Sequence, residues 1–155
     1  MSALAALLSN KVLVAALTWW AVAQLIKVPI NYAIHRKIDL RLWTSSGGMP
    51  SSHAALVCAL ATGVALHAGL NSPLFAMCVA FAMVVMYDAT GVRQAAGKQA
   101  AILNVIVDEM FQGHPISEER LKELLGHTRF QVIVGALMGI LGTLVMWEVW
   151  LAWGD

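Results

Sequence analysis

The chain has 155 residues, enough for one domain, and 59% of them are hydrophobic while only 12% are charged. Soluble domains are roughly 45–50% apolar and about 25% charged, so this composition excludes an ordinary water-exposed surface and indicates a membrane protein. The formal net charge of +1 gives no indication of nucleic-acid binding. Cys58 and Cys78 lie in apolar runs without the spacing of metal ligands, and we expect both to be free, buried thiols.

The apolar residues fall into four stretches of nearly membrane-spanning length. A helix needs about 20 residues, within a range of about 17–25, to cross the hydrocarbon core. We expect spans at about 12–34, 53–70, 72–87 and 130–153. Lys27, near the end of the first span, can extend its ammonium to the membrane interface if it lies close to that interface. The sequence therefore predicts an all-α membrane protein with about four transmembrane helices, organised as a single membrane domain over residues 1–155.

The segment between the third and fourth spans has a different character. Over about residues 91–112 the apolar residues recur at helical spacing, with polar side chains such as Asn104 on another face. This stretch is too polar for a further span, and it predicts an amphipathic helix at the membrane interface. Ser117 is a suitable N-cap for a short helix over about 118–125, in the same loop.

The basic residues predict the orientation in the membrane. Eight Lys and Arg residues lie in the first and third loops, whereas Lys11 stands on the opposite side. Loops rich in Lys and Arg stay in the cytoplasm. We therefore expect an inner or plasma membrane protein with these two loops in the cytoplasm and both termini outside.

The first loop ends in a motif suited to anions, and an apolar helix follows it at once. Gly47 and Gly48 permit unusual backbone angles and close approach by a ligand. Ser51 and Ser52 are good residues for opening a helix, and the free N–H groups of a helix start bind anions. His53 would lie on the first turn beside such an anion. The alternative is a capped helix start with an incidental histidine.

The third loop ends in a similar way. His127 precedes the last apolar helix, Thr128 is a candidate cap for it, and Arg129 is adjacent. Two helix starts, each with a histidine, suit phosphate chemistry, because one imidazole can attack phosphorus while the other protonates the leaving oxygen. The alternative for His127 is a polar loop residue without a chemical role.

A third polar run lies at the end of the third span. Asp88 is costly there unless it is paired, and it could orient a histidine or pair with Arg93. The guanidinium of Arg93 is a bidentate donor suited to phosphate oxygens. Contact with lipid headgroups is the alternative for Arg93 and for Lys98.

The sequence resembles the divergent branch of the type 2 phosphatidic acid phosphatase superfamily, which is related to the vanadium haloperoxidases. The resemblance is carried by three segments, 47–53, 87–93 and 125–128, together with Val132 and Gly135. The resemblance extends over about residues 10–150. In the main superfamily a last histidine is the nucleophile, a middle histidine is the general acid, and an aspartate orients the nucleophile.

The resemblance implies roles for residues of this chain. His127 matches the nucleophile and His53 the general acid, while Gln131 stands where the orienting carboxylate is expected. Gln131 can accept a hydrogen bond from imidazole but cannot supply the negative charge that stabilises an imidazolium. The motif arginine before the nucleophile is missing, and Arg93, or else Arg120, would replace it. The implied phosphate-binding residues are Arg93, Arg41, Lys98, Gly47, Gly48, Ser51, Ser52 and Thr128, and the implied catalytic residues are His127, His53, Gln131 and Asp88.

The leading hypothesis is a metal-independent phosphatase, without cofactor, that hydrolyses a lipid phosphate of the bilayer through a phosphohistidine. One alternative, which Gln131 favours, is a membrane scaffold or lipid-binding protein with a degenerate site. Another is a metal-dependent lipid-headgroup transferase that uses Asp88, Asp108 and Glu109. No nucleic acid partner is expected, and short spans around a polar site would gain from a homodimer.

Overall fold

The described part of the protein is built from helices. The structure, a computed structural model, describes residues 2–45, 47–110 and 127–153. The helix predicted over 118–125 lies outside these residues. In the described chain the elements are α1 (Ala3–Leu8), α2 (Lys11–Leu25), α3 (Lys27–His35), the 3-10 helix η1 (Leu40–Trp43), α4 (Ser52–Ala68), α5 (Pro73–Thr90), α6 (Val92–Met110) and α7 (Arg129–Trp153).

The helices confirm the prediction of an all-α membrane protein. Among the described residues, three helical stretches are long and apolar enough to cross a bilayer, namely Lys11–His35, Pro73–Val107 and Arg129–Trp153. The first comprises α2 and α3. The helix α4 is also apolar and has 17 residues, at the lower end of the range of about 17–25 that a span requires.

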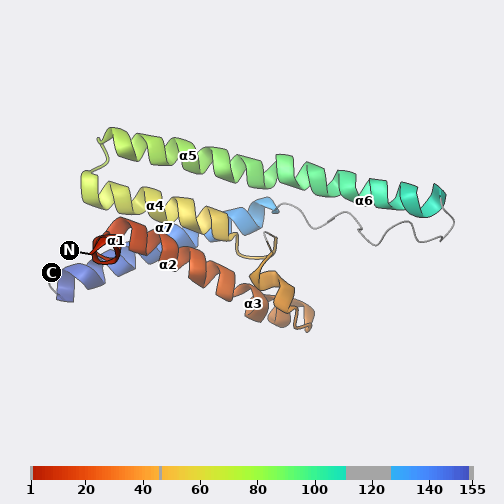
Figure 1. Cartoon of the computed structure of the whole chain (residues 1–155), viewed down its shortest axis with the longest axis horizontal. Coiled ribbons are helices and arrows are strands. Elements are labelled where there is room, and N and C mark those ends of the chain that lie inside the picture. Colours follow the sequence, from red (N-terminus) through yellow and green to blue (C-terminus); the bar gives the residue numbers. More distant parts are fainter. Residues whose placement is uncertain (1, 46, 111–126, 154–155) are drawn as a thin grey trace.

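The helix α4 occupies the centre of the bundle. It packs against α7, α2 and α5, and Figure 1 shows it lying between α5 and the pair formed by α2 and α7. Lipid tails are as apolar as leucine side chains, so helices in a bilayer associate mainly through close packing, which small residues permit. The buried residues of α4 are mostly small: Ser52, Ala54, Ala55, Val57, Cys58, Ala59, Ala61 and Gly63.

Two glycines of α7 allow this close packing. A Cβ on Gly135 would lie 2.3 Å from the carbonyl oxygen of Ser51, and a Cβ on Gly139 would lie 2.3 Å from that of Ala55. Both distances are far below van der Waals contact, and backbone atoms cannot move aside as a flexible side chain can. The two glycines are one helical turn apart, the spacing of the small-xxx-small helix-packing motif. They therefore set the separation of α4 and α7.

The helices α5 and α6 form a long arm beside the bundle. Figure 1 shows them nearly collinear, with α6 extending past the ends of the other helices. The stretch Pro73–Val107 has 35 residues, so it is about 52 Å long, longer than a hydrocarbon core of about 30 Å. The α6 end therefore extends beyond the apolar core unless the arm is strongly tilted. The helix α6 corresponds to the amphipathic helix predicted over 91–112, and its position at the interface stays a prediction.

The chain ends and the first loop lie at opposite ends of the bundle. Figure 1 shows the N- and C-termini at one end, and α3 with the following loop at the other. The helices α4 and α7 both begin at the loop end. This agrees with the predicted placement of both termini on one face, while the assignment of that face to the outside stays a prediction.

Replacement of Gly135 or Gly139 by alanine is expected to destabilise the bundle by about 1–3 kcal/mol, the usual cost of overpacking a well-packed interface. Thermal unfolding in detergent, followed by far-UV circular dichroism, measures the effect. The control is Leu137→Ala, because Leu137 is half exposed on α7 and its loss leaves the helix interface intact. A midpoint for Gly135→Ala at or above that of the unmodified protein would contradict the packing argument.

Candidate functional site

The starts of α4 and α7 meet at the loop end of the bundle. The N–H of Ser51 donates to the carbonyl oxygen of Gln131 at 3.1 Å, and the Oγ of Ser51 caps α4 by accepting from the N–H of Ala54 at 3.3 Å. Ser51 and Ser52 are both buried. Two positive helix ends are thus held side by side, an arrangement that favours an anion.

His127 lies where three helices converge. Its backbone N–H donates to the carbonyl oxygen of Ala89, near the end of α5, at 2.9 Å. The residue is only 3% exposed. Its backbone is thus tied to the end of α5, while Thr128 and then α7 follow it in the chain.

A capping box at the start of α7 orients the imidazole. The N–H of Gln131 donates to the Oγ1 of Thr128 at 3.3 Å, and the N–H of Thr128 donates to the Oε1 of Gln131 at 3.0 Å. The same Oε1 lies 3.2 Å from the Nδ1 of His127. Since this oxygen accepts from Thr128, it is an acceptor for Nδ1 as well, and Nδ1 must carry the proton. The lone pair of His127 is therefore on Nε2.

The Nε2 atom of His127 is buried and meets no hydrogen-bond partner among the described residues. Buried polar atoms without a partner are rare and indicate a strained, catalytic or ligand-binding group. Burial is the main cause that lowers the pKa of His127, and the charges of Lys27 and His53 lower it further. The Gln131 hydrogen bond acts in the opposite direction, as does the nearby Gly48 backbone, although that backbone forms no well-aligned hydrogen bond with Nε2. On balance the pKa of His127 is lowered, which favours the neutral imidazole that a nucleophile requires.

Lys27 is a site residue that the sequence prediction did not include. It begins α3, is 1% exposed, and its Nζ donates to the carbonyl oxygen of Ser45 at 2.9 Å. The first loop folds over this ammonium, and its position near the membrane interface stays a prediction. A charged residue inside an apolar span was the available signal, since such residues usually serve a function. Its charge acts on His127, so the two groups share one electrostatic environment.

Polar residues of the first span hold the loop over the site. The Nε2 of Gln24 donates to the carbonyl oxygens of Trp43 and Leu42. In return, the Nε1 of Trp43 donates to the carbonyl oxygen of Leu25 at 3.2 Å. Gly48 follows with a φ of +87°, which glycine adopts readily and L side chains do not. These contacts bring the first loop back to the start of α4.

Several predicted site residues occupy this region. His53 lies half-buried on the first turn of α4 and acts electrostatically on His127. Gly47 is buried, and its N–H donates to the Oγ of Ser45 at 3.1 Å, so this amide already has a partner. Asp88 is half-buried one residue before Ala89, whose carbonyl binds His127.

Other predicted phosphate ligands lie elsewhere or outside the described residues. Arg41 is exposed and lines a separate cleft with His35 and Lys37. Lys98 is exposed on α6. The side chains of Arg93, Asp108 and Glu109 lie outside the described residues. Among the residues that the structure describes, no three His, Cys, Asp or Glu side chains gather as a metal site.

The fold and the site together define a helical membrane protein in which two helix starts enclose a buried histidine. The sequence profile of the Divergent PAP2 family matches residues 8–142, and the chain belongs to this family, which confirms the resemblance. It is 47% identical over 151 residues to the "Uncharacterized membrane protein YuiD" of Bacillus subtilis (strain 168), covering 90% of this chain and 96% of that protein. No solved structure matches the chain.

The pKa of His127 is expected to lie below the ordinary histidine value of about 6.5. Titration of isotope-labelled histidine by NMR in detergent measures it, with His35 in the separate cleft as an internal comparison. Lys27→Met should raise the pKa of His127, because it removes a positive charge that disfavours the imidazolium. No change in this variant would contradict the proximity of the two side chains.

Proposed function

We propose that this protein is a phosphatase that cleaves a phosphate ester or diphosphate of a membrane lipid, with His127 as the nucleophile. The observation that carries the proposal is the state of the imidazole, whose Nδ1 is held by Gln131 while the buried Nε2 has no partner among the described residues. The family supports the same chemistry. A neutral, oriented imidazole beside two helix starts suits attack on a bound phosphate.

The reaction has two steps. In the first, the Nε2 lone pair of His127 attacks phosphorus, the bond from phosphorus to the lipid oxygen breaks, and His53 gives its proton to the leaving oxygen. In the second, a water molecule attacks phosphorus and gives a proton to His53, the bond between phosphorus and the Nε2 of His127 breaks, and inorganic phosphate leaves. His53 thus alternates between acid and base, which requires its imidazolium form at the start and its neutral form after the first step.

The phosphate is held by positive groups around His127. The dipoles of α4 and α7 point their positive ends at this place, and the ammonium of Lys27 adds a full charge. Lys27 takes the role that the sequence assigned to Arg41, which lies in another cleft. Arg93 keeps its predicted role as a phosphate ligand. The exposed Lys98 and Arg41 instead suit contacts with lipid headgroups on the cytoplasmic face, where the basic loops are predicted to lie.

The test is phosphate release by the purified protein from phosphatidate, phosphatidylglycerophosphate and prenyl diphosphate. His127→Ala should lower kcat/KM by about 10³-fold or more and His53→Ala by about 10²–10⁴-fold. His35→Ala, at an exposed histidine of the separate cleft, should leave activity unchanged. Full activity in both His127→Ala and His53→Ala would overturn the assignment. Phosphate binding without turnover in the unmodified protein would favour the non-catalytic alternative.

Gln131→Glu is expected to raise the pKa of His127 and to speed the first step. A carboxylate stabilises the positive charge that develops on the imidazole during phosphohistidine formation, whereas an amide oxygen offers only a dipole. The acidic limb of the pH–rate profile should therefore move to higher pH, with kcat increased above that limb. Gln131→Leu removes both the orienting bond and half of the α7 capping box, and it should lower kcat. An unchanged pH profile in Gln131→Glu would contradict the contact between residue 131 and His127.

A further inference from the structure

Gln24 and Lys27 share an acceptor in the first loop. The Nε2 of Gln24 lies within hydrogen-bond distance of three carbonyl oxygens, those of Leu42, Trp43 and Ser45. The Nζ of Lys27 donates to the Ser45 oxygen at 2.9 Å, and the Nε2 of Gln24 lies 3.3 Å from the same oxygen. One buried loop carbonyl thus has two alternative donors from the first span.

The donors at this place outnumber the acceptors. The amide of Gln24 has two N–H groups for three carbonyls, and the ammonium of Lys27 has three N–H groups. The bond to Ser45 is the one hydrogen bond of that ammonium among the described residues, although Lys27 is only 1% exposed. Buried charged groups usually have their hydrogen-bonding capacity satisfied. The remaining N–H groups are therefore available to a ligand with several acceptor oxygens, such as a phosphate.

The first loop also connects this ammonium to His127. Gly48 lies against the stem of Lys27, since a Cβ on Gly48 would be 3.7 Å from the Cδ of Lys27. The Gly48 backbone lies near the imidazole of His127, and the charge of Lys27 acts on that imidazole as well. A phosphate bound at His127 is therefore near the ammonium.

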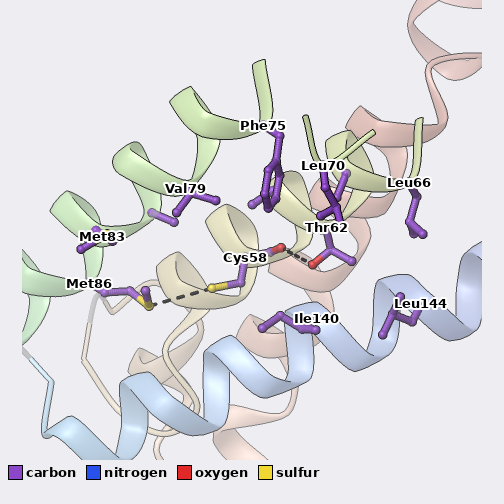
Figure 2. Close-up of a pocket in the computed structure, with 13 residues that line it drawn as sticks. Cys58, Thr62, Leu66, Leu70, Phe75, Val79, Met83, Met86, Ile140 and Leu144 are labelled. Atoms are coloured by element: carbon purple, nitrogen blue, oxygen red, sulfur yellow. Dashed lines mark hydrogen bonds between the residues drawn. The ribbon is translucent and has the colours of Figure 1, made fainter. Parts of the chain in front are cut away.

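The bundle is closed on the other side of His127. Figure 2 shows the apolar pocket between α4, α5 and α7. A buried cluster separates this pocket from the site, and its members are Ala54, Ala89 and Val132. A phosphate therefore approaches His127 from the loop end, past the carbonyls that Gln24 and Lys27 hold.

We propose that Gln24 is a positioning residue of the phosphate site, and that it takes over the Ser45 carbonyl when the ammonium of Lys27 turns to a bound phosphate. The inference rests on the phosphatase function proposed above. A buried carbonyl without a donor is costly, so an abandoned Ser45 oxygen would weaken phosphate binding. Because the amide of Gln24 is already 3.3 Å away, a small movement keeps that oxygen bonded. The first loop then stays over the site while Lys27 changes its partner.

The experiment measures the affinity for inorganic phosphate by phosphorus NMR titration in detergent, for Gln24→Met, Lys27→Met and the double variant. Gln24→Met keeps the length of the side chain and removes both N–H groups. It should weaken phosphate binding about tenfold, the order expected for a buried carbonyl left without a donor. In the Lys27→Met background the same change should have little effect, because no ammonium then leaves the carbonyl.

The matched control is Asn31→Leu. The Nδ2 of Asn31 donates to the carbonyl oxygen of Lys37 at 2.8 Å. This variant also removes a bond between the first span and the first loop, but at an acceptor that Lys27 does not share. Its affinity for phosphate should stay near that of the unmodified protein.

The pKa of His127 in the phosphate-free protein separates positioning from a purely structural role. In Gln24→Met it should stay near its value in the unmodified protein, because Lys27 remains on the Ser45 carbonyl. A loop that opens would instead expose the imidazole and raise the pKa towards the ordinary value, because burial is the main cause that lowers it.

Unchanged affinity in Gln24→Met, equal losses in both backgrounds, or an equal loss in Asn31→Leu would overturn the inference, as would an unmodified protein that binds no phosphate. If Gln24→Met does not fold, the NMR signal of the labelled Gln24 amide should shift on phosphate addition in the unmodified protein but not in Lys27→Met, and an unshifted signal would overturn the inference. None of these results decides the phosphatase assignment, which depends on lipid turnover and its loss in the His127 and His53 variants.

Discussion

The structure depends on the close approach of α4 and α7 at their first turns. Gly135 lets the backbone of α7 contact the backbone of Ser51, and the bond from the Ser51 N–H to the Gln131 carbonyl fixes the register of the two helices. Any larger residue at position 135 would separate the two helix starts. Their positive ends would then no longer act on one anion, and His127 would lose the environment that buries it. The close packing of the two helix starts and the positive potential between them thus both depend on the contact between Gly135 and Ser51.

Gln131 joins helix capping to the orientation of the candidate nucleophile. Its oxygen accepts from the Thr128 N–H and from the His127 Nδ1, so a single side chain both starts α7 and fixes a tautomer. A carboxylate could do the same, and its charge would also raise the pKa of the imidazole. Lys27 and burial act in the opposite direction. A neutral residue at position 131 is consistent with a site that keeps its histidine uncharged and supplies positive charge to the phosphate from elsewhere.

The sequence predicted the helices well and the site in part. Hydropathy alone locates the four apolar stretches, because membrane-spanning length is imposed by the bilayer. The motifs around His53 and His127 predicted that both histidines open helices, and the structure brings the two together. Lys27 was missed because its role depends on the first loop folding over it, a tertiary contact held by Gln24 that no local pattern encodes. Arg41 was included for its charge and sequence position alone, and the fold directs it to another cleft.

The burial of Lys27 strengthens the electrostatic effect of its charge on the neighbouring groups. A charge in a medium of low dielectric constant interacts more strongly with its neighbours than the same charge in water, and an ammonium at 1% exposure is costly to keep there without compensation. The Ser45 carbonyl supplies a dipole rather than a charge. An incoming phosphate would supply the charge. The same burial that lowers the pKa of His127 thus increases the attraction of this place for an anion.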